Sequence, residues 1–149
     1  MMSPTVLYRA WDYTHEKMLT KNITAFSVEG TNIIIQLTTQ KKAFEYIPNA
    51  ELLPFTGQTD SEMTPIFSGD ILAFCFDREA YNNVEILAVV EWSSYWNGWI
   101  LWNWNALEGR QDIPIGEAGV DLKATGAHIV GNKFEHKHLL TQTNYDETD

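Results

Sequence analysis

The chain consists mainly of short runs of β-branched and aromatic residues that alternate with polar turn residues. The clearest hairpin signal joins Ile23–Val28 to Ile33–Leu37, because Gly30 between them can adopt the positive φ of a tight turn. Helical periodicity is almost absent, so the pattern favours an all-β, or at least β-dominated, domain. The other expected strands are Val6–Asp12, Lys17–Leu19, Ala43–Ile47, Asp70–Phe76, Val84–Trp92, Trp99–Trp104 and Ala127–Gly131.

Alternate side chains of the expected strand Val84–Trp92 are uniformly apolar on one face, so this face is predicted to line the core. These side chains are Val84, Ile86, Ala88, Val90 and Trp92.

Helical structure is expected in two short segments. Asn49 can cap a single helical turn that Pro54 would end. Asn132 and Glu135 have the spacing of a capping box, which predicts a short C-terminal helix through Leu140. The glycines and proline of Asn105–Gly126 indicate a long irregular loop with a short strand at most.

The stretch from Thr56 to Phe76 contains a sharp Gly69-Asp70 corner that precedes a hydrophobic strand. A hairpin after this corner, followed by a third antiparallel strand, is compatible with a small SH3-like barrel. We therefore expect a single domain over residues 1–149. It comprises a β-rich N-terminal subdomain (1–55), a barrel-like subdomain (56–140) and an acidic tail (141–149).

The formal net charge of −10 is unevenly distributed. Residues 1–50 contain five Lys/Arg and four Asp/Glu, a net charge of +1, whereas residues 51–149 contain five and sixteen, a net charge of −11. Binding to duplex nucleic acid needs a basic patch that displaces counterions. No cationic cluster is larger than Lys41-Lys42, so no duplex nucleic-acid partner is expected.

Cysteine content and hydropathy indicate the compartment. The lone Cys75 lies between two phenylalanines and is expected to be a small buried residue. One cysteine and the lack of a signal-peptide pattern favour the reducing cytoplasm. No apolar run approaches the roughly 20 residues that cross a bilayer, so no membrane contact is expected.

The most unusual feature is a cluster of aromatic residues. It consists of Trp92, Tyr95, Trp96, Trp99, Trp102 and Trp104. In a regular strand Trp102 and Trp104 lie on the face opposite Trp99, and both faces cannot belong to one small core. The rings therefore fill the core, form an interface with a protein partner or a second copy, or offer a platform for a proline-rich peptide, bases or sugars.

No residue pattern indicates catalysis. Asp70 is expected to accept backbone N–H bonds beside a positive-φ Gly69, and nothing in the sequence brings Asp60 to a defined separation from it. The histidines lack the spacing of a zinc site, and no phosphate-binding loop or nucleophile motif is present. We therefore expect a protein that is not an enzyme and that uses no metal or cofactor.

Three blocks of sequence carry a resemblance. The first is YRAWD with KML, within Tyr8–Leu19; the second is LLPFTG, Asp60 and IFSGDIL, within Leu52–Leu72; the third is VGNKFEHKHLL at Val130–Leu140. In this order, over nearly the whole chain, the blocks resemble the YopX family of phage and prophage proteins. The motif residues, to which we assign structural roles, are Trp11, Asp12, Thr56, Gly57, Asp60, Gly69, Asp70, Gly131 and Asn132.

The chain departs from the family pattern in two places. Ser61-Glu62-Met63-Thr64 stands where a Lys-Asn-Gly-Lys type of turn is usual, and His136-Lys137 stands where Asn-Pro is usual. The resemblance implies a small intracellular β protein encoded by a phage or prophage, with an accessory role such as binding a host or phage protein. It brings no catalytic residues to this chain.

The leading hypothesis is a non-enzymatic accessory protein that binds a protein partner or forms a homo-oligomer. One alternative is a single-stranded nucleic-acid or DNA-metabolism module that stacks bases on its tryptophans. Another is an acidic decoy that mimics DNA, which requires the acidic residues after Ala50 to form one stripe.

Overall fold

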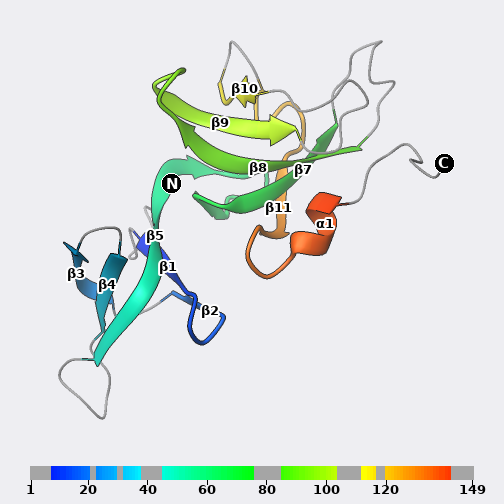
Figure 1. The fold of residues 1–149 in the computed structure, drawn as a ribbon. Helices are drawn as coiled ribbons and strands as arrows, with labels where there is room; N and C mark the ends of the chain where they lie inside the picture. Colours follow the sequence, from blue (N-terminus) through cyan, green and yellow to red (C-terminus); the bar gives the residue numbers. More distant parts are fainter. Residues whose placement is uncertain are drawn as a thin grey trace. The chain divides into compact units, whose positions relative to one another are not determined.

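The computed structural model describes residues 8–20, 23–29, 32–37, 45–75, 85–103, 112–116 and 120–141 (Figure 1). The chain divides into two compact units, Met1–Phe55 and Thr56–Asp149, hereafter unit 1 and unit 2.

Strands dominate the structure, which confirms the all-β prediction. The strands are β1 (Tyr8–Asp12), β2 (Lys17–Leu19), β3 (Ile23–Glu29), β4 (Asn32–Leu37), β5 (Glu45–Thr59), β6 (Pro65–Phe67), β7 (Asp70–Cys75), β8 (Glu85–Ser93), β9 (Gly98–Asn103), β10 (Asp112–Pro114) and β11 (His128–Asn132). The helix α1 (Lys137–Thr141) follows β11. In the part of the chain that the structure describes, no helix has the length and hydropathy to span a bilayer.

Unit 1 is an antiparallel sheet in the order β2-β1-β5-β4-β3, where β5 continues beyond the unit. The predicted hairpin is present, with β3 and β4 paired from Ile23↔Leu37 to Glu29↔Asn32. A small buried core holds the sheet together. It consists of Ala10, Leu19, Ile35, Ile47 and Ala50.

The helical turn expected after Asn49 is wrong, because these residues lie inside β5. Asn49 has a φ of 57°, and the pairing of β4 with β5 shifts between Ile33↔Ala50 and Ile35↔Ile47, which leaves one extra residue on β5. Asn49 is thus a left-handed bulge residue of the kind that asparagine tolerates. Strands on both sides supply the backbone hydrogen bonds of this segment, and a single helical turn cannot match that number.

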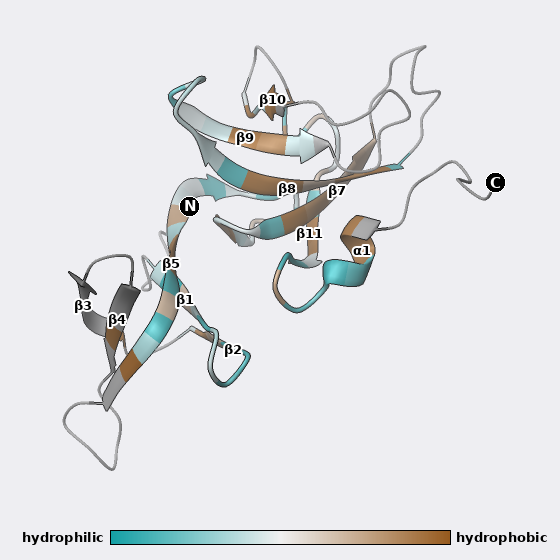
Figure 2. Cartoon of the chain, in the orientation of Figure 1, coloured by the Kyte–Doolittle hydropathy of each residue, from teal (hydrophilic) through white to brown (hydrophobic). Residues whose placement is uncertain are grey.

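Unit 2 contains an antiparallel sheet in the order β10-β9-β8-β7-β11, and β6 pairs with β5. This sheet curls (Figure 1), and hydrophobic residues follow β7, β8 and β9 (Figure 2). The finer expectation of an SH3-like barrel stays a prediction. The buried core consists of Ile66, Leu72, Phe74, Ile86, Ala88, Val90, Leu101, Val120, Leu122 and Ala127.

The predicted core face of β8 is confirmed at Ile86, Ala88 and Val90, which are buried in this cluster. It is wrong at Trp92, which is 54% exposed, and Val84 lies outside the described residues. Trp92 stands one pair from the end of the hairpin, beside the exposed turn, and its cross-strand partner Trp99 is only partly buried against the core.

Cys75 is exposed, contrary to the expectation of a buried thiol. The reason is its place in the strand: it is the last residue of β7 and pairs with the exposed Glu85 at the start of β8. The apolar residues beside Cys75 in the sequence were therefore a poor guide to its exposure.

The C-terminal helix exists but begins at Lys137, later than the capping pattern suggested. The short strand allowed within Asn105–Gly126 is β10, and the closing strand is β11. The acidic tail, apart from Thr141, lies outside the described residues.

Candidate functional site

The hairpin formed by β8 and β9 places four aromatic residues around one turn. Trp92 pairs with Trp99 and Ser93 with Gly98, so the turn consists of residues 94–97. The Ser93 Oγ accepts a 3.2 Å hydrogen bond from the Trp96 N–H, and Asn97 takes a φ of 52° that closes the turn. We call Trp92, Tyr95, Trp96 and Trp99 the aromatic tip.

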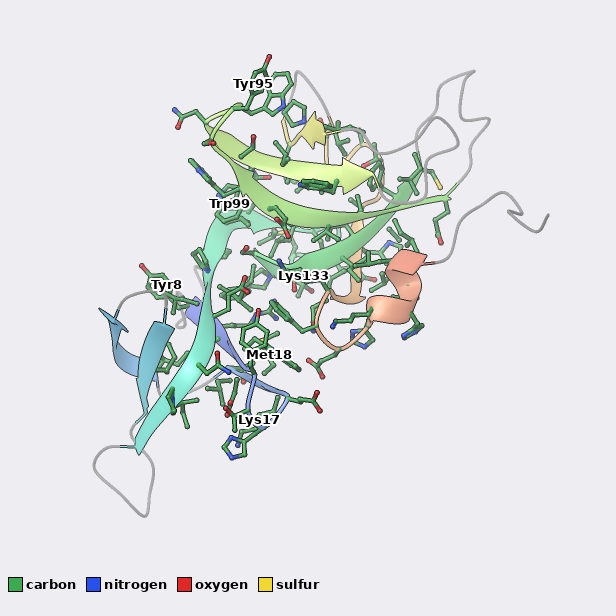
Figure 3. The ribbon with its side chains drawn as sticks, in the orientation of Figure 1. Tyr8, Lys17, Met18, Tyr95, Trp99 and Lys133 are labelled. Carbon is green, nitrogen blue, oxygen red and sulfur yellow. The ribbon has the colours of Figure 1, made fainter. Side chains whose placement is uncertain are left out.

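The rings of the aromatic tip reach solvent to different extents. Tyr95 is 87% exposed and projects from the end of the hairpin (Figure 3), and Trp96 is 48% exposed. Trp99 is half-buried and packs against the core of unit 2. Large exposed aromatic rings gathered on one turn are unusual for a protein surface, and exposed apolar patches are common at interaction sites.

The rings associate as two perpendicular pairs. The centroids of Trp92 and Trp99 are 5.5 Å apart at an interplanar angle of 81°. Those of Tyr95 and Trp96 are 5.4 Å apart at 83°. Such edge-to-face pairs are favourable and hold the rings in defined orientations. Neither pair forms a flat platform on which two successive bases could stack.

The predicted aromatic cluster is therefore divided. Trp92, Tyr95 and Trp96 are exposed and Trp99 is half-buried beside them. Trp102 is also half-buried, but it shares a face with its cross-strand partner Val89 and not with the core-facing Trp99. Trp104 lies outside the described residues.

The motif residue Asp60 is a buried hydrogen-bond acceptor. Its Oδ1 accepts the N–H groups of Glu62 and Thr64, each at 2.9 Å, and its Oδ2 accepts that of Ile129 at 3.0 Å. The turn that follows Asp60 departs from the one that the resemblance implies, yet two of its backbone donors bond to this carboxyl group and the Met63 N–H bonds to the Asp60 carbonyl. Asp60 also joins this turn to β11, which is 69 residues away in sequence.

The Gly69-Asp70 corner is likewise held by backbone contacts. Asp70 Oδ2 accepts the Phe67 N–H at 2.8 Å, and Gly69 bonds through its N–H to Val90 and through its carbonyl to Lys133. Gly69 has a φ of 88°, and a Cβ there would stand 3.2 Å from the Phe134 ring. Both requirements favour glycine at this position.

Asn132 and Gly131 organise the turn before α1. Asn132 Oδ1 accepts the N–H groups of Phe134 and Glu135, and its Nδ2 donates to Glu135 Oε1 at 3.0 Å. These are the contacts of a capping box, although the helix itself begins only at Lys137. His136 lies against Gly131, where an added Cβ would be 2.6 Å from Nδ1. The same Nδ1 accepts the Asn132 N–H at 3.1 Å.

In unit 1, Asp12 is likewise a buried acceptor of backbone N–H groups. Its Oδ1 accepts the N–H groups of Thr14 and His15, and its Oδ2 lies 2.8 Å from His15 Nδ1. Burial by itself raises the pKa of Asp12, but the hydrogen bonds and charge of His15, with the Thr14 N–H, outweigh it and hold the pKa below the ordinary 3.8.

Two further motif residues have local roles. Thr56 Oγ1 donates to the Ile66 carbonyl at 2.8 Å and accepts the Gln58 N–H at 3.1 Å, which ties β5 to β6. Gly57 has a φ of 85°, a conformation that glycine adopts without strain. Trp11 is buried in β1.

The buried polar residues of the described ranges are Asp12, Asp60, Asp70 and Asn132. Each accepts at least one backbone N–H of a turn. The described residues contain no group of three or more His, Cys, Asp or Glu side chains that could hold a metal ion. The motif thus closes turns, and the aromatic tip is the candidate site.

Sequence reasoning missed two contacts in unit 2. Lys133 Nζ forms a 2.8 Å ion pair with Glu91 Oε1 of β8 and lies 5.3 Å from the centre of the Phe134 ring. His136 packs on Gly131. The ion pair of Lys133 joins residues that are far apart in sequence, so no local pattern could have predicted it. The packing of His136 on Gly131 had a weak local signal, because the glycine directly precedes a turn that contains histidine.

Comparison with known proteins gives one family. The family model described as "YopX protein" matches residues 7–141. A search of curated proteins found no match. The matched range covers most of the sequence and contains all three motif blocks, so the chain belongs to the YopX family.

Proposed function

We propose that this protein is a non-enzymatic accessory protein of a phage or prophage, and that it binds a protein partner through the aromatic tip. One observation carries the proposal: Trp92, Tyr95 and Trp96 expose large parts of their rings on a single turn. Aromatic rings have few torsions to freeze, so they anchor protein interfaces at low entropic cost.

The absence of a catalytic role is supported by how the buried acids are used. Asp60 and Asp70 are almost wholly buried, and they bond to backbone N–H groups of nearby turns. A general acid or base must reach the proton of a substrate within hydrogen-bond distance. Side chains that are buried in turn contacts are poorly placed for that task.

A protein partner is favoured over a nucleic acid for two reasons. The ring pairs are perpendicular, so successive bases could not stack on both members of a pair. In addition, no Lys or Arg occurs from Glu79 to Gly109, whereas single-strand binding combines stacking with a cationic groove. The expected readout for nucleic acid is therefore no salt-dependent tryptophan quenching by oligonucleotides.

Affinity capture from host-cell lysate tests the proposal with three baits. These are the wild type, the tip variant Trp92→Ala/Tyr95→Ala/Trp96→Ala, and the control Tyr13→Ala. Tyr13 is a matched control because its exposed fraction of 45% is similar to the 48% of Trp96 and because it lies in unit 1. The tip variant retains Trp102, because this side chain is half-buried.

The wild type and Tyr13→Ala should retain the same protein, and the tip variant should lose it. Size-exclusion chromatography with light scattering on the same three proteins measures self-association at high concentration. Equal capture by all three baits, together with equal masses in solution, would reject the tip as a binding surface.

A further inference from the structure

We infer that the segment of the partner that contacts the aromatic tip is a basic stretch of polypeptide, rich in arginine or lysine. This inference rests on the proposed function and adds the chemistry of the partner. It combines three observations: the charge of unit 2, the chemistry of the exposed rings, and the position of nearby cations.

The formal net charge of the protein lies in the unit that bears the tip. Unit 1 contains five Lys/Arg and five Asp/Glu and is neutral, whereas unit 2 contains five and fifteen and has a net charge of −10. A field of one sign raises the association rate with partners of the opposite sign and disfavours partners of the same sign. Unit 2 therefore attracts cationic chains.

The exposed rings suit the same partner. Tryptophan gives the strongest cation–π contacts of the aromatic side chains, and Trp92 and Trp96 are about half exposed. Arginine also stacks on aromatic faces through its planar guanidinium. A basic stretch can thus bind the tip through both its charge and its side-chain shape.

The segment that carries these rings has no cationic side chain of its own. The hairpin segment Glu79–Gly109 contains no Lys or Arg. Lys133, which the turn after β11 brings to β8, is bonded to Glu91 at 2.8 Å and lies over the Phe134 ring. A cation supplied by a partner would therefore meet no competing lysine or arginine from within the hairpin.

A second copy of this chain is a poorer occupant. A symmetric dimer through the aromatic tip would bring two units of net charge −10 together. Like charges at an interface oppose association, most strongly at low salt. Charge complementarity selects a basic partner over self-association.

Titration calorimetry with two synthetic peptides tests the inference on the full chain. One peptide alternates arginine and serine, and the other carries citrulline, a neutral isostere, at each arginine. We expect the arginine peptide to bind, the citrulline peptide to bind at least tenfold more weakly, and the affinity to fall about tenfold when NaCl rises from about 0.05 M to about 0.5 M.

Single substitutions in the aromatic tip, together with the tip variant, show whether the arginine peptide binds at these rings. Trp92→Ala and Trp96→Ala should each weaken the arginine peptide about two- to fivefold, which matches the usual strength of an exposed cation–π contact. Tyr13→Ala should leave its affinity unchanged. In the wild type, the indole N–H resonances of Trp92 and Trp96 should shift on addition of the arginine peptide.

Three results would overturn the inference. They are equal affinity for both peptides, full affinity in the tip variant, and no binding of the arginine peptide at low salt. None of them decides the proposed function, because tip-dependent capture of a host protein or tip-dependent dimers would still support it. If the arginine peptide did not bind and the tip variant also showed no change in capture or in self-association, both the inference and the proposed function would be rejected.

Discussion

The two units are stabilised by the same device but present different surfaces. Asp12 in unit 1 and Asp60 in unit 2 are both buried, and each accepts backbone N–H groups from the turn that follows it. Unit 1 is electrically neutral, whereas unit 2 has a net charge of −10 and bears the aromatic tip. The motif residues therefore hold turns in both units, and the proposed recognition rests on what unit 2 adds.

Removal of the Asp60 carboxyl group should have the largest effect. Asp60→Ala leaves three backbone N–H groups without their acceptor, and we expect a loss of about 3–4 kcal/mol in the free energy of unfolding of unit 2. Urea denaturation followed by tryptophan fluorescence measures it. Asp121→Ala is the matched control, because Asp121 accepts two turn N–H groups in the same way but is exposed.

The control should cost no more than about 1 kcal/mol, since water can replace the lost acceptor. Similar losses for Asp60→Ala and Asp121→Ala would mean that burial does not decide the role of the motif carboxyl groups. Buried carboxyl groups would then not be what stabilises the turns of the two units.

Asp12→Ala should destabilise unit 1 by about 2 kcal/mol, because two turn N–H groups and His15 lose their partner. Amide exchange should accelerate in β1 and β2. The pKa of Asp12 is lower in the folded state, so its contribution is present above the ordinary value of 3.8 and is lost as the pH falls through the lowered value. Acid should thus weaken the wild type in that range and affect Asp12→Ala less.

The sequence predicted the architecture better than the surface. Strand positions follow from local composition, and Asp70 accepts a backbone N–H at the corner as expected. Asn132 makes the contacts of the expected capping box, but α1 begins later than that pattern suggested. The bulge at Asn49 depends on pairing with two neighbouring strands, and its residue type alone also fits a helix cap. The exposure of Trp92 depends on where the core ends, which alternation along one strand cannot show.

Gly131→Ala tests one of the two contacts that sequence reasoning missed, the packing of His136 on Gly131. The new Cβ would stand 2.6 Å from His136 Nδ1, so we expect a loss of about 1–2 kcal/mol from overpacking. The double variant Gly131→Ala/His136→Ala should recover part of the loss in urea denaturation, because it removes the ring that clashes. A double variant whose loss equals the sum of the two single losses would show that the His136 ring is not the source of the strain.

The tip variant Trp92→Ala/Tyr95→Ala/Trp96→Ala should have the smallest effect on stability. The three side chains are exposed by about half or more, so their removal should change the free energy of unfolding by less than about 1 kcal/mol in total. Trp99→Ala is the contrast, because Trp99 packs against the core, and we expect a loss of about 2–3 kcal/mol. Both are measured by urea denaturation followed by circular dichroism, since the variants remove fluorophores. A tip variant as unstable as Trp99→Ala would make the exposed rings part of the fold. The difference between the units would then be one of packing, and recognition would have to be sought elsewhere on unit 2.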